Sequence, residues 1–268
     1  MKISVVTVTL NSRLHLAETI QSVLSQGYDD LEYLIVDGGS TDGTVDLIRE
    51  QADRDPRIRW TSEPDAGIAD AFNKGIRRAS GDLIGIINAD DRYLPGALAA
   101  VAAAYAAHPD CDVFHGDMVR YEGETPLFLL KPTPVETHIW REMPLNHPTT
   151  FVTRRAYERV GGFDRRFRVA MDYDLVLRLY RAGCRFWYLD QPLAAMRYGG
   201  ASDSRFLDGL REVRRATVRA GYPPLRAWYW FLVKAAFGYA KLLLRRLGLT
   251  RLMRLHPRFR APEQGRVA

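Results

Sequence analysis

The sequence predicts an α/β protein in which a mostly parallel central sheet is flanked by helices. Segments of β-branched and apolar residues alternate with segments of helical periodicity from the first residues onward. Consecutive strands joined through helices pair in parallel, because the crossover returns the chain to the same edge of the sheet. The 268 residues, of which 47% are hydrophobic, are enough for a large buried core.

The first strand is predicted over residues 3–10 (ISVVTVTL), which are β-branched and nearly all apolar. Residues 15–26 then carry apolar side chains at helical spacing, and residues 31–37 (LEYLIVD) form a second strand. The next elements are a helix over 44–52, a strand over 57–60, a helix over 68–80 and a strand over 82–91. The opening segment is too short and polar for a signal peptide, and the two cysteines have no disulfide or metal spacing, so we expect a cytosolic protein.

Polar and acidic side chains stand at the carboxyl ends of these predicted strands. The fourth strand, for example, runs directly into Asp90 and Asp91. The carboxyl ends of parallel strands meet at one edge of the sheet, which is where ligands bind in such folds. The residues gathered at this edge are Thr9, Asn11, Asp37, Asp65, Asp90 and Asp91. The sequence therefore predicts a binding crevice rich in carboxylates.

Three common motifs are excluded. No G-x-G-x-x-G follows the first strand, so the dinucleotide-binding fingerprint is absent. The glycine spacing of Gly38–Gly43 matches a P-loop, but Thr44 stands where the phosphate-binding lysine must be. A calcium loop beginning at Asn88 fails because Arg92 and Ala99 occupy two ligand positions.

A diphosphate held through a divalent metal ion fits the crevice. Asp90 and Asp91 offer hard oxygen ligands for Mg²⁺ or Mn²⁺, and such an ion neutralises the charge of a leaving diphosphate. Asp37 is placed to accept hydrogen bonds from a nucleotide base or a ribose.

Four fragments within residues 3–91 carry a family resemblance. SVVTVTLNS, LIVDGGSTDGT, EPDAGIADAFNKGI and GDLIGIINADD together resemble the nucleotide-binding half of family 2 glycosyltransferases, whose fold is the GT-A type. Residues 146–183 resemble the acceptor-binding segment of that family. Where the family usually has Glu-Asp, this chain has Met171 and Asp172. The resemblance extends over residues 2–204.

The resemblance implies one-step, inverting transfer of a sugar from a nucleotide diphosphate, with UDP as the expected nucleotide, to a hydroxyl of a saccharide or lipid-linked acceptor. It implies that Asp172 is the catalytic base, that Asp91 binds the metal ion, and that Asp90 faces the metal or the ribose. The residues implied to line the nucleotide are Thr7, Thr9, Asn11, Asp37, Asp65, Asn73 and Lys74. His147 is a candidate for contact with the diphosphate or the acceptor, and Arg197 for contact with the diphosphate.

Several alternatives stay open at this point. Asp172 begins a predicted helix, whose dipole is expected to keep its pKa low, and Asp174 or His147 are the alternative bases. A nucleotidyltransferase shares strand-end acids, although it usually has a glycine- and arginine-rich phosphate loop. A catalytically inactive sugar-nucleotide-binding or scaffold protein is suggested by Met171, which replaces an acid.

The chain is predicted to comprise a nucleotide-sugar-binding half (1–110), an acceptor-binding half (111–204) and a basic helical tail (205–268). The tail contains 15 Lys and Arg against 3 Asp and Glu, a net charge of +12, whereas the preceding residues, with 23 against 29, carry −6. A helix is predicted over residues 225–248. Its apolar run is broken by Lys234 and Lys241, which argues against a membrane span.

At 100° per residue, the basic side chains of this helix, Arg226, Lys234, Lys241 and Arg245, fall within one arc of roughly 100°. This pattern predicts a helix lying on an anionic membrane surface, basic side toward the head groups. We therefore expect a protein peripheral to the inner face of the cell membrane. The alternative is a helix packed on the catalytic body or in a homodimer interface. Nucleic acid is not an expected partner, because so large an apolar face would have no use there.

Overall fold

The computed structural model describes residues 1–123, 125–197 and 205–246. The first elements along the chain are β1 (Ile3–Thr9), α1 (Arg13–Leu24), β2 (Leu31–Asp37), α2 (Thr44–Arg54), β3 (Ile58–Ser62), α3 (Ile68–Arg78), β4 (Leu83–Asn88), β5 (Arg92–Tyr93) and α4 (Ala97–Ala107). The remaining ones are β6 (Val113–Glu122), β7 (Thr125–Leu130), α5 (Val135–His138), the 3-10 helix η1 (His147–Thr149), β8 (Phe151–Thr153), α6 (Arg154–Val160), α7 (Met171–Arg181), β9 (Phe186–Arg197), α9 (Phe206–Arg219) and α10 (Pro224–Arg246).

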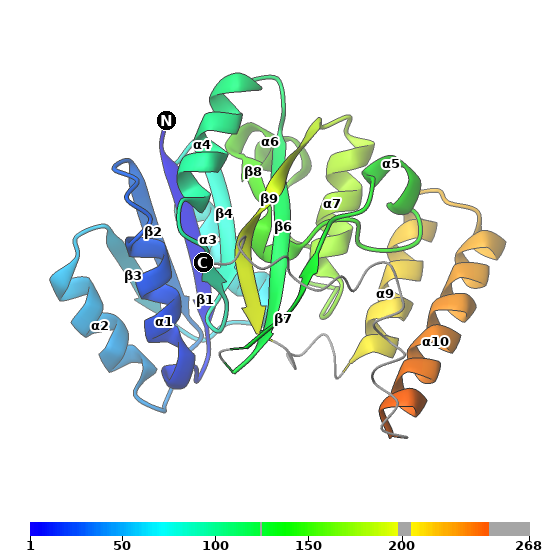
Figure 1. Cartoon of the computed structure of the whole chain (residues 1–268), viewed down its shortest axis with the longest axis horizontal. Helices are drawn as coiled ribbons and strands as arrows, with labels where there is room; N and C mark the ends of the chain where they lie inside the picture. Colours follow the sequence, from blue (N-terminus) through cyan, green and yellow to red (C-terminus); the bar gives the residue numbers. More distant parts are fainter. Residues whose placement is uncertain (124, 198–204, 247–268) are drawn as a thin grey trace.

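One sheet runs through the molecule, with helices on both sides (Figure 1). In the described part of the chain its strand order is β3-β2-β1-β4-β8-β6-β9-β5, and β7 pairs with β6. The strands β3, β2, β1 and β4 pair in parallel, as predicted. The second half of the sheet is mixed, because β8 runs antiparallel to both β4 and β6 while β6 and β9 are parallel. The predicted α/β class with flanking helices is confirmed.

The register of the parallel strands aligns their carboxyl ends. Thr9 of β1 pairs with Asp37 of β2, which in turn pairs with Ser62 of β3. On the other side of β1, Val8 pairs with Asn88 at the end of β4. Four strands therefore finish at one level, and the loops that follow them share one edge of the sheet.

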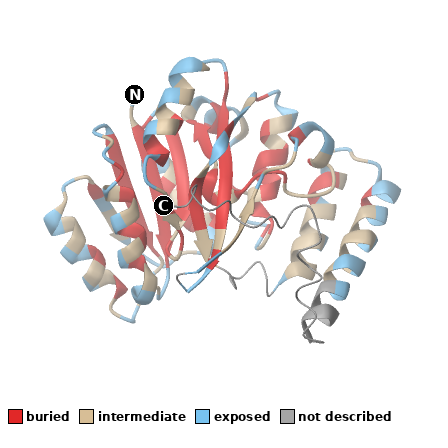
Figure 2. Cartoon of the chain, viewed as in Figure 1, coloured by how far each residue is buried: buried red, intermediate tan, exposed pale blue. Residues whose placement is uncertain are grey.

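Each face of the sheet has its own buried core, as expected when the residues of a strand alternate between faces. Val6 and Val8 of β1 belong to the core beneath α3, α6, α7 and α9. Ile3 and Val5 belong to the core beneath α1, α2 and α4. Figure 2 shows this arrangement, with buried residues concentrated along the central strands and exposed residues on the outer sides of the helices.

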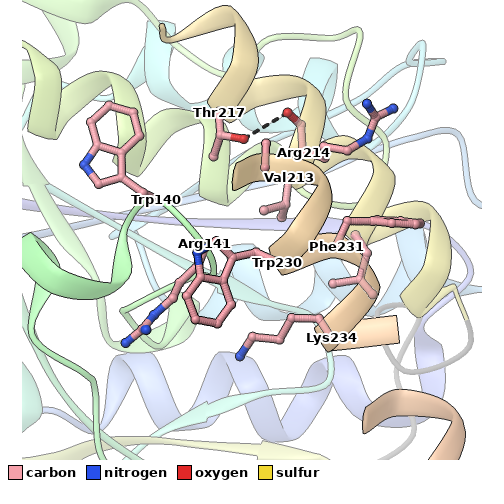
Figure 3. Close-up of a pocket in the computed structure, with 10 residues that line it drawn as sticks. Trp140, Arg141, Val213, Arg214, Thr217, Trp230, Phe231 and Lys234 are labelled. Carbon is pink, nitrogen blue, oxygen red and sulfur yellow. Dashed lines mark hydrogen bonds between the residues drawn. The ribbon is translucent and has the colours of Figure 1, made fainter. Parts of the chain in front are cut away.

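The C-terminal helices α9 and α10 lie side by side at the end of the molecule opposite α2 and β3 (Figure 1). Ala216 of α9 belongs to one of the two cores, and aromatic and charged side chains complete the interface with the body. Trp140 stacks on Tyr222 with ring centroids 5.3 Å apart, and the guanidinium of Arg141 lies 4.9 Å from the ring centroid of Trp230 (Figure 3). Among the described residues, no helix combines the length and apolar character needed to cross a bilayer.

The predicted orientation of α10 is wrong in one respect. Lys234 forms an ion pair with Glu142 of the body, so it does not belong to an outward basic side. Arg226 is exposed, whereas the side chains of Lys241 and Arg245 lie outside the described ones. The outer face of α10 instead carries large uncharged side chains, which are Leu225, Trp228, Tyr229, Leu232 and Tyr239. A helical wheel cannot tell which arc meets the rest of the protein, and here the inner arc carries the lysine.

Candidate active site

The end of β2 holds a completely buried carboxylate, Asp37. Its Oδ2 accepts hydrogen bonds from the backbone N–H groups of Gly39 and Ser40, both at 2.9 Å, and from the hydroxyl of Ser62 at 2.7 Å. The hydroxyl of Ser40 donates to Oδ1. The loop after β2 and Ser62 of β3 therefore satisfy this acid fully, and the acid holds the loop in a fixed turn.

Asn11 and Asp65 flank the same loop. The backbone N–H of Thr41 donates to Asn11 Oδ1 at 2.9 Å, which ties the loop after β1 to the loop after β2. Asp65 lies against Gly38, since a Cβ at that glycine would stand 2.5 Å from Asp65 Oδ2. The structure thus brings Asn11, Asp37 and Asp65 together, and a side chain at position 38 would displace the carboxylate of Asp65.

The two threonines of β1 differ in what they can reach. Thr7 is fully buried, and its hydroxyl shares a 3.0 Å hydrogen bond with the hydroxyl of Tyr33. Its side chain belongs to the core rather than to the crevice. Thr9 lies two residues closer to the edge, and its Oγ1 is enclosed without a hydrogen-bond partner among the described residues.

The side chains of Asn73 and Lys74 bind neighbouring segments of the protein. The side chain of Asn73 accepts from the backbone N–H of Phe163 at 2.7 Å and donates to the carbonyl of the same residue at 2.9 Å. The ammonium of Lys74 donates to the carbonyl of Pro64 at 2.8 Å and pairs with Glu63 at 3.2 Å. Both side chains are engaged by protein groups, Asn73 with the turn before α7 and Lys74 with the loop that carries Asp65.

Asp91 is buried at the end of β4 beside the partly exposed Asp90. Its Oδ2 accepts from the amide of Asn88 at 3.0 Å, and its Oδ1 lies 3.4 Å from the backbone N–H of Arg197. Burial and the neighbouring charge of Asp90 raise the pKa of Asp91 to about 8. Two acids close together, with few hydrogen bonds to offset their negative charge, form a site that favours the binding of a cation.

Two arginines lie next to this acid pair, and they share partners that the sequence did not point to. Arg92 and Arg197 both pair with Glu18 of α1, the second at 3.1 Å. Both guanidinium groups also lie over the ring of Tyr121, at 4.3 Å and 5.1 Å from its centroid. Glu18 and Tyr121 come from α1 and β6, so no local sequence pattern connects them with Arg197.

Asp172 and His147 meet on the other side of β4. Both line a small cavity of about 20 Å³ together with Ile86 and Phe163. The Nε2 atom of His147 is enclosed and has no hydrogen-bond partner among the described residues. A cavity of this size holds roughly one water molecule. Asp172 is therefore next to an imidazole and a small cavity, not simply at an exposed helix start.

The expectation that the helix dipole keeps the pKa of Asp172 low is wrong. Burial raises the pKa of Asp172, and the nearby imidazolium of His147 only partly offsets this. Conversely, burial lowers the pKa of His147, while the charge of Asp172 acts in the opposite direction. The two groups thus influence each other's protonation, and desolvation outweighs the dipole.

Asp174, an alternative base, has a structural task. Its carboxylate accepts from Arg178 Nε at 2.8 Å, one turn further along α7. The same guanidinium donates to the carbonyls of Val160 and Gly162, both at 2.7 Å. Asp174 is buried in this arrangement and thus holds the turn between α6 and α7.

The oxygen atoms around Asp91 suit a hard divalent cation. Asn88 Oδ1 is enclosed without a hydrogen-bond partner among the described residues, and it stands beside the two carboxylates. No cluster of three or more acidic, histidine or cysteine side chains with metal-binding geometry occurs in the described part of the chain. Because Mg²⁺ and Mn²⁺ are commonly held by one or two carboxylates together with substrate phosphates, this donor set fits such an ion.

Comparison with known proteins defines the class. Residues 4–168 match the model of glycosyl transferase family 2, so the chain belongs to this family of glycosyltransferases. It is 33% identical over 215 residues to the O-antigen biosynthesis protein RfbC of Myxococcus xanthus, a match that covers 78% of this chain and 17% of that protein. It is 28% identical over 239 residues to a PGL/p-HBAD biosynthesis glycosyltransferase of Mycobacterium bovis, covering 84% of this chain and 90% of the relative.

Solved structures share the fold. A mannosyltransferase from Pyrobaculum calidifontis in complex with GDP-Man and Mn²⁺ superposes with a TM-score of 0.66 at 19% identity, covering 96% of this chain and 81% of that one. S. aureus TarS 1-349 in complex with UDP-GlcNAc gives a TM-score of 0.64 at 18% identity, covering 86% and 70%. The predicted GT-A type fold is therefore confirmed, and the C-terminal helices are present.

Proposed function

We propose that this glycosyltransferase is a metal-dependent, inverting enzyme that moves a sugar from a nucleotide diphosphate to an acceptor hydroxyl. The observation that carries the proposal is the buried, poorly compensated carboxylate of Asp91, with the partly exposed Asp90 beside it, at the end of β4. It lies at the edge of the sheet where β1 and β2 end and the loops after them begin. A nucleotide bound over those loops would direct its diphosphate toward the acids and Arg197.

The donor we propose is a UDP-sugar, with a GDP-sugar as the second candidate. The structural relatives that bind UDP-GlcNAc and GDP-Man support these two nucleotide classes. Thr9, Asn11, Asp37 and Asp65 would line the base and ribose. Asp37 would exchange one or more of its four hydrogen bonds for donors of the nucleotide.

The acceptor we propose is a saccharide or a lipid-linked saccharide of cell-surface glycoconjugate synthesis. The names of the relatives from Myxococcus and Mycobacterium support this class. Asp172 would take the proton of the acceptor hydroxyl while the new sugar–oxygen bond forms. Such general base catalysis typically contributes about 10²–10⁴-fold to the rate, and attack from the face opposite the leaving diphosphate inverts the anomeric carbon.

Asp91 and Asp90, with the amide oxygen of Asn88, would hold Mg²⁺ or Mn²⁺, which supplies positive charge to stabilise the leaving diphosphate. His147 stands beside Asp172 and would keep this base ionised when its own ring is protonated. Arg197 would add a second positive charge near the diphosphate once its pairing with Glu18 loosens. Apart from Arg197, which reaches the donor side from the second half, these roles follow the proposed division into a donor half (1–110) and an acceptor half (111–204).

Thermal stabilisation by a panel of nucleotide sugars tests the donor and metal assignments together. UDP-GlcNAc, UDP-glucose and GDP-mannose are added with and without Mn²⁺ to wild type, to Asp91→Asn and to the control Asp53→Asn, an exposed acid of α2. We expect a Mn²⁺-dependent rise in melting temperature for wild type and the control, and none for Asp91→Asn. An equal rise in Asp91→Asn would contradict the metal assignment, and no rise with any sugar nucleotide would contradict the donor class.

We also propose that the enzyme works at the inner face of the cell membrane, with α9 and α10 against anionic lipid. The outer face of α10 is apolar and aromatic, with Leu225 at 85% and Leu232 at 60% exposure. Next to it is a groove of about 410 Å³ that is lined by Trp228 of α10 and by several arginines of α9. Arg214 stacks 4.0 Å over the Trp228 ring. Apolar insertion beside a row of positive charges suits a bilayer interface that carries negative head groups.

A further inference from the structure

A carboxylate from α9 is bound at the start of the helix that carries Asp172. Both oxygens of Glu212 face the backbone N–H of Arg168, at 2.9 and 3.1 Å. Glu212 Oε2 also accepts from the N–H groups of Val169 and Ala170, at 2.9 and 2.8 Å. Three consecutive backbone donors thus surround one side chain in an anion-binding turn. Ala170 is the N-cap of α7, and Asp172 follows two residues later.

The segment before α7 is held by α9 over its whole length. Arg215 donates to the carbonyl of Arg166 at 2.7 Å, and Arg219 donates to Asp164 at 3.2 Å. Glu212, Arg215 and Arg219 are spaced by three and four residues, so they lie on one side of α9. Gly209 allows the close approach, since a Cβ there would be 3.2 Å from Val169 Cγ1. Of these three side chains, Glu212 reaches the residues nearest to Asp172.

Glu212 also supplies a second acid where the sequence lacks one. The family usually has Glu-Asp at positions 171 and 172, but Met171 is a buried apolar residue of the core. A carboxylate nevertheless stands at the start of α7, and it comes from a helix 40 residues further along the chain. Its negative charge and its hydrogen bonds both act on the turn from which Asp172 projects.

We infer that Glu212 is the positioning residue of the proposed base, fixing the first turn of α7 so that Asp172 meets the acceptor. The inference rests on the proposed role of Asp172. A catalytic group must be held within a fraction of an ångström of its productive position, and a displacement of about 1 Å can cost 10²-fold in rate. Without Glu212, three N–H groups before α7 would lose their acceptor, and the start of the helix would be free to shift.

The charge of Glu212 gives a signature that a purely structural contact would lack. Asp172 is faced by His147 from η1 and by Glu212 from α9, and these act in opposite directions. The negative charge of Glu212 disfavours ionisation of Asp172 and so contributes to its raised pKa. Removing that charge should lower the pKa of Asp172, so the acidic limb of the rate profile should move to lower pH.

The test compares Glu212→Gln, Glu212→Asp and the control Asp208→Asn, an acid one turn earlier on α9 that pairs with the surface arginines Arg205 and Arg211. Release of nucleoside diphosphate from UDP-GlcNAc or GDP-mannose in Mn²⁺ is followed against pH. We expect kcat to fall about tenfold in both Glu212 variants with donor affinity unchanged. The acidic limb should move to lower pH in Glu212→Gln and stay in place in Glu212→Asp, which keeps the charge.

Normal kcat in both variants would overturn the inference, and so would a loss of kcat in Glu212→Gln without movement of the limb. Equal loss of donor affinity and kcat would also overturn it, because that would indicate general damage to the fold. Asp172→Asn separates this inference from the proposed function. If that variant stays active, Asp172 is not the base, whatever the Glu212 variants do. If it is inactive while both Glu212 variants behave as wild type, only the positioning role fails.

Discussion

The ends of β2 and β4 each carry a buried aspartate, and the two differ in how many hydrogen bonds the protein gives them. Asp37 is 0% exposed and receives four hydrogen bonds, two from its own loop backbone and two from serine hydroxyls. Asp91 is 2% exposed, receives one good hydrogen bond from Asn88, and stands beside a second acid. At the same edge of the sheet, the carboxylate of Asp37 therefore has all its hydrogen bonds, whereas that of Asp91 is buried with few.

The difference separates an acid whose hydrogen bonds are satisfied within the protein, Asp37, from an acid whose hydrogen bonds are not, Asp91. A carboxylate whose oxygens are all satisfied stabilises the loop that surrounds it. A carboxylate that is buried without compensation costs stability, and such groups cluster where a protein binds ions or performs chemistry. Asp172 belongs with Asp91 in this respect, since burial raises the pKa of both acids. Three substitutions of comparable chemistry can test whether this distinction holds.

The largest effect is expected from Asp172→Asn. The amide keeps the size of the side chain but cannot accept a proton, so turnover should fall by about 10²–10⁴-fold with donor affinity nearly unchanged. In wild type, transfer requires the ionised acid, so activity should be lost as the pH falls through the raised pKa, at a higher pH than for an ordinary aspartate. Steady-state rates of nucleoside diphosphate release, measured against pH, check both points. Near-normal turnover would leave Asp172 as a helix-start residue and direct the search for the base to His147.

A smaller effect, on stability, is expected from Asp37→Asn. The new NH₂ group would face donors instead of accepting from them, at a site with no access to water. We expect the free energy of unfolding to fall by about 2 kcal/mol, whereas Asp91→Asn should leave it close to wild type because the carboxyl group of Asp91 has few hydrogen bonds to lose. Urea unfolding of the two variants measures this difference directly. Equal losses in both variants would contradict the distinction drawn between the two acids.

The smallest effect is expected on the outer face of α10. Leu225→Glu/Leu232→Glu places two charges on the proposed membrane face and should reduce flotation with vesicles of phosphatidylglycerol and phosphatidylcholine roughly tenfold. Leu14→Glu is the matched control, because Leu14 is 84% exposed on α1, far along the chain from the C-terminal helices. Catalytic rates should remain unchanged in both variants. Equal flotation of both variants and wild type would count against the membrane face and leave a protein partner as the occupant.

Local sequence predicted well the edge of the sheet at which the parallel strands end. Buried β-branched strands, helical spacing and strand-end acids are patterns within short segments, and parallel pairing follows from the strand–helix–strand order. The carboxyl ends of β1, β2 and β4 are aligned as expected. Thr7 shows the limit of this prediction, since it lies two residues further from the edge than Thr9, and its hydroxyl bonds to Tyr33 inside the core instead of lining the crevice.

The surroundings of Asp172 could not be predicted in the same way. Its pKa is set by burial, by His147 and by Glu212, and the last two lie 25 and 40 residues away in sequence. The effect of the helix dipole depends only on the position of Asp172 in α7, so it predicted a lowered pKa, whereas burial raises the pKa. The inward orientation of Lys234 was missed for a related reason, because its partner Glu142 lies on a distant segment.

The double hydrogen bond between Asn73 and the backbone of Phe163 joins the donor-side helix α3 to the turn that precedes α7. One amide side chain bonds there as a peptide group would, so α3 and the turn before α7 are held together. In the proposed function, the span between donor and acceptor would then be independent of the loops after β1 and β2. Such a framework can acquire a different sugar nucleotide through changes in those loops alone, while the distance over which the sugar travels stays the same.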